Sequence, residues 1–251
     1  MSDSIIITIV NDSDEGMADE LLRPYAPPPG GFPLIQGIEE VDDSPLTGPI
    51  FSAEGDESGP IELFCPGGDT PGRGPITITI EPRNAFGDGR HATTWLCLRF
   101  LLELLGGIPR EDRPGLSLLD AGTGSGVLAI TASRLGVGHI DAVEVNPHAA
   151  ECAAHNIGEN GCGTIKLHQS YIASFNPGRT YDIILANLVT DVIIGSLDAL
   201  VALIGAGGTL IASGVSVGRD ELVMQSFLSK GLRLLDHARH DGWCGYVMRK
   251  G

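Results

Sequence analysis

Hydrophobic and polar residues follow two alternating patterns along the last two thirds of the chain. Short apolar runs typical of buried β-strands are separated by segments in which apolar residues recur at helical spacing. This alternation favours an α/β protein with a doubly wound sheet. Strands are predicted at residues 76–81, 116–120, 139–144, 164–168, 181–187, 209–213, 233–238 and 245–250, helices at 91–105, 127–135, 147–157, 191–203 and 219–229, and a glycine-rich turn at 205–208.

The first 75 residues have a different pattern. A strand is predicted at 4–10 and a helix at 12–22, and the proline-rich segment that follows indicates turns and extended linker. This region holds 15 of the 32 acidic residues and only two of the 16 basic ones, so most of the net charge of −16 lies in it. We therefore predict a small N-terminal lobe at 1–75 and a second domain at 76–251. The acidic lobe could steer a basic substrate or simply form a solvated surface.

Composition also limits the partners and the compartment. The acidic charge argues against direct binding to nucleic acid, because it would repel the phosphates. No apolar run reaches the roughly 18 residues of a membrane span, and no basic segment with a cleavage site opens the chain. A cytoplasmic protein without a membrane partner is expected. The five cysteines show no CxxC spacing and no neighbouring histidine cluster, so they are expected to be reduced, and no metal site is predicted.

The strand at 116–120 leads into a loop of alternating glycines. The segment LLDAGTGSG ends the strand on Asp120 and places Gly122, Gly124 and Gly126 in the turn before the next helix. Glycine accepts positive φ and has no side chain, so this backbone can pass close under a ligand. A dinucleotide fingerprint has its third glycine one residue later, and an acid at the strand end suits a cationic ligand better than a pyrophosphate. The loop therefore favours S-adenosylmethionine (SAM) over NAD, and a turn that binds nothing is the third interpretation.

Polar side chains stand at the ends of several predicted strands. Asp120, Glu144 and Asn187 each close a strand, and Ser170 comes just after another. In open α/β sheets, ligands bind outside the carboxyl ends of the strands, where the strand order reverses. A carboxylate at the end of the second strand, such as Glu144, can accept hydrogen bonds from a ribose diol. The four side chains are therefore expected to converge on one binding site.

Four segments of the chain resemble one family, the PrmA methyltransferases, which act on protein eleven of the large ribosomal subunit. They are AFGDGRHATTWLCL at 85–98, LLDAGTGSGVLAI with VEVNPHA, DIILANLVTDVI, and DGWCGYVMRK near the C-terminus. The first segment discriminates best, since other SAM enzymes lack it. The resemblance covers about residues 76–250. It implies a seven-stranded Rossmann-like methyltransferase sheet beside a small divergent N-terminal lobe, with SAM as cofactor, a ribosomal protein as partner and no metal.

Position by position, the resemblance also implies roles for single residues. Contact with SAM is implied for Thr94, Gly122, Glu144 and Asn187, a place beside the adenine for Ser170 and Tyr171, and a place in the loop over the donor for Phe86, Gly87 and Gly89. The chain departs from the family pattern at Asp88, Arg90 and Ala92 in this loop, and its first 75 residues show no clear resemblance. Methyl transfer is therefore better supported than the identity of the acceptor.

The expected chemistry is methyl transfer to an amine. The side-chain carbonyl of Asn187 is expected to orient the amine, because an amide accepts a hydrogen bond without favouring the charged ammonium as a carboxylate would. His91 is the one candidate general base in the matching segments, and helix capping or packing is its alternative role. The predicted function is a SAM-dependent protein N-methyltransferase acting on lysine or N-terminal amines of a ribosomal protein. A different protein or small-molecule acceptor, and a SAM-binding protein without turnover, remain alternatives.

Overall fold

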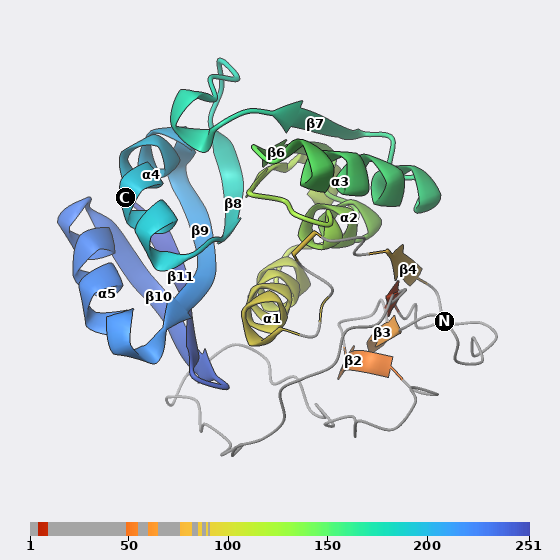
Figure 1. Ribbon diagram of the computed structural model, residues 1–251, viewed down its shortest axis with the longest axis horizontal. Coiled ribbons are helices and arrows are strands. Elements are labelled where there is room, and N and C mark those ends of the chain that lie inside the picture. The colour runs from red at the N-terminus through yellow and green to blue at the C-terminus, as the bar shows by residue number, and fades with distance from the viewer. Residues whose placement is uncertain are drawn as a thin grey trace.

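Seven strands of the C-terminal part form one sheet in the order β10-β11-β9-β8-β5-β6-β7 (Figure 1). The computed structural model describes residues 5–9, 49–54, 60–64, 76–81, 85–86, 89 and 91–251. Neighbouring strands are parallel, except that β11 runs antiparallel to both β9 and β10. The strands are β5 (Ser117–Ala121), β6 (His139–Glu144), β7 (Ile165–Gln169), β8 (Tyr181–Asn187), β9 (Ile204–Ser216), β10 (Leu232–His240) and β11 (Trp243–Lys250).

Helices cover both faces of this sheet. Helices α1 (Ala92–Gly106), α2 (Val127–Arg134) and α3 (Pro147–Glu159) pack on one face, and α4 (Thr190–Leu203) and α5 (Asp220–Ser229) pack on the other. Strand β8 shows why its continuous apolar sequence predicts burial on both sides. Ile183 and Leu185 join the core under α1–α3, whereas Ile184 and Ala186 join the core under α4 and α5. The doubly wound α/β prediction is confirmed.

A second, four-stranded sheet has the order β2-β3-β1-β4. Its strands are β1 (Ile5–Ile9), β2 (Pro49–Glu54), β3 (Pro60–Phe64) and β4 (Ile76–Ile80). Strand β1 confirms the strand predicted at 4–10, and it pairs in parallel with β4, Ile5 opposite Ile76. Strand β4 was expected with the C-terminal domain, but it pairs with β1 in this four-stranded sheet, which we call the front sheet. Its Ile78 and Ile80 nevertheless pack into the core under α1–α3. The boundary after residue 75 remains a prediction, and β4 connects the two parts on either side of it.

The predicted turn at 205–208 is wrong, because these residues belong to β9. The strand starts at Ile204 opposite Tyr181, and the next pair of the register joins Ile183 to Thr209. The extra residues on the β9 side form an irregularity in which Gly207 has φ +70°. A glycine cluster within an apolar sequence is thus accommodated as a bulged strand start instead of a turn.

The helix starts follow the sequence signals. Asn146 caps α3 by accepting a hydrogen bond from His148 N at 2.9 Å, and Pro147 occupies the first turn, as predicted. The helix predicted at 12–22 lies outside the described residues. None of the helices in the described ranges is long and apolar enough to cross a membrane.

Candidate functional site

A cavity of about 590 Å³ lies at the carboxyl ends of β5, β6 and β8. Strand order reverses between β5 and β8, which is where an open α/β sheet leaves room for a ligand. Six of the predicted site residues line the cavity, namely His91, Gly122, Gly124, Glu144, Ser170 and Asn187. Three others, Thr94, Asp120 and Gly126, are not among its lining residues. Of the four strand-end residues expected to converge, Glu144, Ser170 and Asn187 line this one cavity and Asp120 does not; that the cavity is a binding site stays a prediction.

The loop glycines have positive φ, and at Gly124 the surrounding backbone also leaves no room for a side chain. Gly122 has φ +77° and Gly124 has φ +56°. A Cβ added to Gly124 would lie 2.3 Å from the carbonyl oxygen of Phe86, and one added to Gly122 would lie 2.3 Å from the Leu188 side chain. The Phe86 carbonyl also accepts a hydrogen bond from Ser125 N at 2.9 Å. The segment before α1 is thereby held directly against the glycine loop.

Asp120 lies behind this loop. Its Oδ2 accepts hydrogen bonds from Thr123 Oγ1 at 2.6 Å and from Ala129 N at 3.2 Å, so it ties the loop to the start of α2. Its Oδ1 is buried and has no hydrogen-bond partner among the described residues. Burial raises the pKa of Asp120 to about 6, and the charge of Glu144 adds to the rise, while the two hydrogen bonds oppose it. The geometry gives Asp120 a part in shaping the loop, and ligand contact by this residue stays a prediction.

Glu144 reaches across from the end of β6 to the glycine loop. Its Oε2 accepts a hydrogen bond from Gly124 N at 3.1 Å, and its Oε1 accepts from Val145 N and Asn146 N, both at 2.9 Å. Three backbone N–H groups thus fix the carboxylate in place at the cavity wall. Each carboxylate oxygen has two lone pairs, so three of the four acceptor positions are used and one, on Oε2, remains for a hydroxyl of a diol. The next strand end supplies Ser170, whose N–H donates to the Glu144 carbonyl at 3.0 Å.

Asn187 ends β8 at the same cavity. Its Nδ2 donates to Thr94 Oγ1 at 3.3 Å, and its Oδ1 is buried without a hydrogen-bond partner among the described residues. A buried amide oxygen without a partner is costly, and a ligand that donates a hydrogen bond would relieve that cost. Thr94 itself is fully buried in α1, whereas Thr93, which sequence reasoning did not single out, lines the cavity. Thr94 therefore contacts Asn187, and its predicted contact with SAM has no support in the cavity lining.

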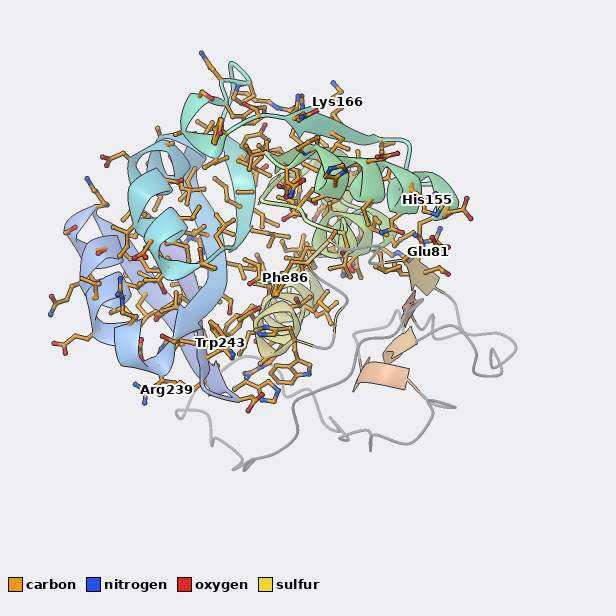
Figure 2. The ribbon with its side chains drawn as sticks, in the orientation of Figure 1. Glu81, Phe86, His155, Lys166, Arg239 and Trp243 are labelled. Atoms are coloured by element: carbon orange, nitrogen blue, oxygen red, sulfur yellow. The ribbon has the colours of Figure 1, made fainter. Side chains whose placement is uncertain are left out.

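His91 is the N-cap of α1. Its Nδ1 accepts a hydrogen bond from Thr93 N at 3.4 Å and lies 2.9 Å from Thr93 Oγ1. The imidazole packs edge-on against two rings, with its centroid 5.2 Å from that of Phe86 and 5.0 Å from that of Trp243. Phe86 and Trp243 are labelled in Figure 2. The capping and packing role weighed for His91 is therefore present. A role as a base stays a prediction and would fall to Nε2.

Apolar side chains that sequence reasoning did not select complete the cavity. Leu188, Val189 and Val192 follow Asn187 and line the wall toward α4, and Val189 is 63 % exposed. Tyr171, which was predicted beside an adenine, also lines the cavity and is 70 % exposed. Gly87 of the predicted covering loop lies outside the described residues. The position of the two valines shortly after the end of β8 was the sequence signal that could have identified them as cavity residues.

One group of possible metal ligands occurs among the described residues, away from the cavity residues above, and is formed by Asp220, His237 and Cys244. Arg239 donates to Asp220 Oδ2 through Nε at 3.1 Å and Nη2 at 2.6 Å, and Tyr246 donates to Oδ1 at 2.8 Å. Burial raises the pKa of the Cys244 thiol to about 11. The guanidinium and the protonated thiol both disfavour a cation here, while His237 Nε2 lies 3.0 Å from Asp220 Oδ1 and is buried without a hydrogen-bond partner among the described residues.

The strand order, the antiparallel β11 and the cavity beside a glycine loop define the class of Rossmann-like methyltransferases. A crystal structure of ribosomal protein L11 methylase from Lactobacillus delbrueckii subsp. bulgaricus has the same fold, with a TM-score of 0.64 and 24 % identity over 72 % of this chain and 90 % of that one. The model of the family "Ribosomal protein L11 methyltransferase (PrmA)" matches residues 65–251, and the chain belongs to this family.

Relatives named ribosomal protein L11 methyltransferase support the assignment. The protein of Pelotomaculum thermopropionicum is 37 % identical over 177 residues, and that of Geobacter sulfurreducens is 38 % identical over 179 residues. These alignments cover 70 % and 71 % of this chain, but 55 % and 56 % of the relatives. The chain thus spans a little over half the length of the curated relatives it matches.

Proposed function

We propose that this protein is a SAM-dependent methyltransferase that modifies an amine of a protein, with ribosomal protein L11 as the first candidate acceptor. One observation carries the proposal: the cavity brings the glycine loop and the fixed carboxylate of Glu144 together with Asn187 Oδ1, which is buried and has no hydrogen-bond partner among the described residues. The names of the relatives supply the acceptor. A cytoplasmic location accompanies the proposal, because ribosomal proteins are made there.

The donor end of the cavity would be formed by β5 and β6. Glu144 is positioned to accept a hydrogen bond from a ribose hydroxyl, and Ser170 and Tyr171 stand at the next strand end, where a purine ring could pack against the exposed tyrosine. SAM supplies a methyl group already activated by a sulfonium. The residues of the chain then have to bind, orient and keep out water.

The acceptor end would be formed by Asn187 and the aromatic residues around His91. A lysine amine has a pKa of about 10.4, so holding it neutral at pH 7 costs about 4.6 kcal/mol at about 1.36 kcal/mol per pKa unit. Apolar surroundings lower that pKa, and the amide oxygen of Asn187 can accept an N–H of the neutral amine without stabilising the ammonium as a carboxylate would. The lone pair would then point to the methyl group. His91 Nε2 is the candidate to receive the proton that the product releases.

The test is incubation of the full chain with purified L11 and SAM, followed by intact mass spectrometry of L11. Mass additions corresponding to whole methyl groups are expected. Asn187→Asp, with the same shape as asparagine, should slow turnover at saturating SAM and move the rate profile to higher pH, because a carboxylate favours the ammonium. SAM binding without methylated L11 would shift the acceptor to another protein or a small molecule. Absence of SAM binding would overturn the proposal itself.

A further inference from the structure

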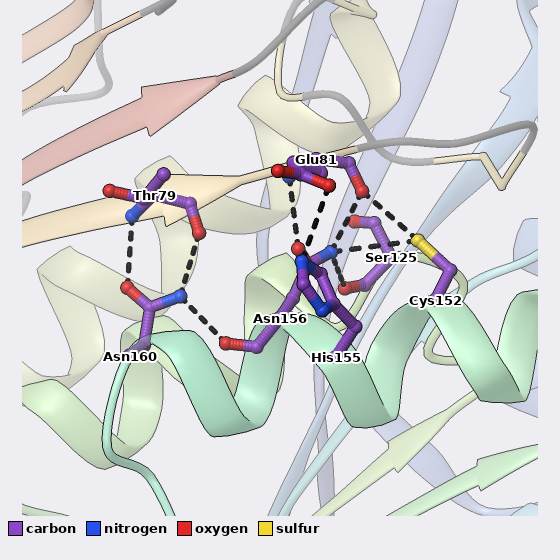
Figure 3. Close-up of polar contacts among 7 residues, drawn as sticks. All are labelled: Thr79, Glu81, Ser125, Cys152, His155, Asn156 and Asn160. Atoms are coloured by element: carbon purple, nitrogen blue, oxygen red, sulfur yellow. Dashed lines mark hydrogen bonds and ion pairs between the residues drawn. The ribbon is translucent and has the colours of Figure 1, made fainter.

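Two asparagine side chains form hydrogen bonds with the backbone along the outer edge of β4, where no further strand of the described ranges pairs with it. Asn160 accepts a hydrogen bond from Thr79 N at 2.9 Å and donates to Thr79 O at 2.6 Å, and Asn156 makes the same pair of contacts with Glu81, at 2.9 and 3.0 Å (Figure 3). Both asparagines are buried, at 8 % and 1 % exposure. The edge of the front sheet is therefore closed by α3 and not by another strand.

The spacing of the two elements explains the match. Residues four apart on a helix are separated by about 6 Å along its axis, at about 1.5 Å per residue. Residues two apart on a strand are separated by about 6.6 Å, at about 3.3 Å per residue. Asn156 of α3 and Asn160, its C-cap, can therefore meet Glu81, which directly follows β4, and Thr79 within it. His155 adds an ion-pair contact with Glu81, 3.2 Å from Nε2 to Oε2.

Asn156 makes a contact with the glycine loop that Asn160 lacks. Its Nδ2 also donates to Ser125 O at 2.8 Å, and Ser125 is the buried residue between the last two glycines of the loop. Asn160 Nδ2 instead donates its second hydrogen to Asn156 O at 2.8 Å, within its own helix. Both hydrogens of the Asn156 amide and its oxygen are used, so one side chain fixes the separation between Glu81 and the loop.

The same loop residue is held from both sides. The Ser125 N–H donates to Phe86 O at 2.9 Å, while the Ser125 carbonyl accepts from Asn156. Glu81 and Phe86 are the two ends of the short segment that leads from β4 to the cavity wall. A shift of β4 would therefore act on the glycine loop through Asn156, and a shift of the loop would act on β4.

We propose that Asn156 is a positioning residue that couples docking of the front sheet to SAM binding at the glycine loop. This inference rests on the proposed SAM site. Coupling between two sites is reciprocal, so SAM must stabilise the contact of β4 with α3 to the extent that this contact favours SAM binding. A front sheet that carries an acceptor protein would in this way promote binding of the methyl donor.

The first test compares Asn156→Asp with Asn160→Asp, two isosteric changes that each point a carboxylate at two backbone carbonyls. Both should destabilise the edge of β4. SAM affinity, measured by calorimetry on the full chain, should fall about tenfold in Asn156→Asp and stay within about twofold of wild type in Asn160→Asp, a difference within the range of known couplings. Equal SAM affinities in the two variants would overturn the inference and leave Asn156 as a strand clamp.

A second test uses the wild-type chain and does not depend on the variants folding. Amide hydrogen exchange at Glu81, whose N–H is bonded to Asn156, should slow several-fold when SAM is added, although Glu81 does not line the cavity. Unchanged exchange in the presence of confirmed SAM binding would refute the coupling alone. Failure of SAM to bind the wild-type chain would instead refute the proposed function.

Discussion

Replacing Gly124 by alanine should weaken both the fold and the SAM site. Gly124 has φ +56°, and an alanine held in the left-handed region costs about 1–2 kcal/mol. The new Cβ would also lie 2.3 Å from Phe86 O, so the segment before α1 or the loop must move. That movement breaks the 2.9 Å hydrogen bond from Ser125 N and leaves a buried donor without a partner, at a further cost of about 1–3 kcal/mol.

Gly231 provides the matched control. It has φ +78°, and a Cβ there would meet nothing within 4 Å, so Gly231→Ala introduces the same backbone strain without a clash. Urea unfolding followed by circular dichroism should show that Gly124→Ala loses about 1–3 kcal/mol more than Gly231→Ala. Calorimetry should show weakened SAM binding in Gly124→Ala alone. Equal losses of stability, with unchanged SAM affinity, would refute the idea that the segment carrying Phe86 rests on the loop.

Three further substitutions test the other residues of the site. Thr94→Val removes the acceptor for Asn187 Nδ2, a hydrogen bond of about 0.5–1.5 kcal/mol, and should lower kcat about 3- to 10-fold while SAM affinity is unchanged. Weaker SAM binding at unchanged kcat would instead show that Thr94 contacts SAM itself. Glu144→Gln turns one fixed acceptor into a donor that faces backbone N–H groups, so SAM affinity should fall about tenfold or more. Calorimetry that shows wild-type affinity would exclude a hydrogen bond between Glu144 and the ribose of SAM. Asp120→Asn tests pH dependence: the raised pKa of about 6 means that the stability contributed by the protonated carboxyl is present below about pH 4 and is lost as pH rises through about 6. The unfolding free energy of the asparagine variant, measured by urea titration, should therefore rise by about 2 kcal/mol relative to wild type from about pH 4 to pH 7, and a pH-independent difference would contradict the raised pKa.

The sequence predicted the sheet and the place of the site because both depend on local patterns. Apolar runs defined the strands, and the carboxyl ends of parallel strands necessarily meet at one edge, which brought Glu144 and Asn187 to the same cavity. Which of two adjacent threonines faces that cavity could not be read from the sequence. Successive residues on a helix point about 100° apart, and only the docking angle of α1 decides that Thr93 faces the cavity while Thr94 meets Asn187.

The pairing of strands that lie far apart in the chain could not be predicted from the sequence either. Nothing in the local sequence of residues 76–80 indicates that β4 joins β1 in a separate sheet, because the choice depends on partners far away in the chain. The asparagines of α3 likewise look like ordinary polar positions on a helix. Their function depends on backbone groups of Thr79 and Glu81, 81 and 75 positions earlier.

The pairing of β4 with the front sheet also affects the order in which the two sheets can form during synthesis. All four strands of the front sheet lie within residues 5–80, so that sheet can be complete on the ribosome before any strand of the large sheet has been made. Its outer edge then stays open until α3 is synthesised and Asn156 and Asn160 cover it. An open strand edge is a template for unwanted pairing, so the nascent chain exposes such a template in the interval before α3 emerges.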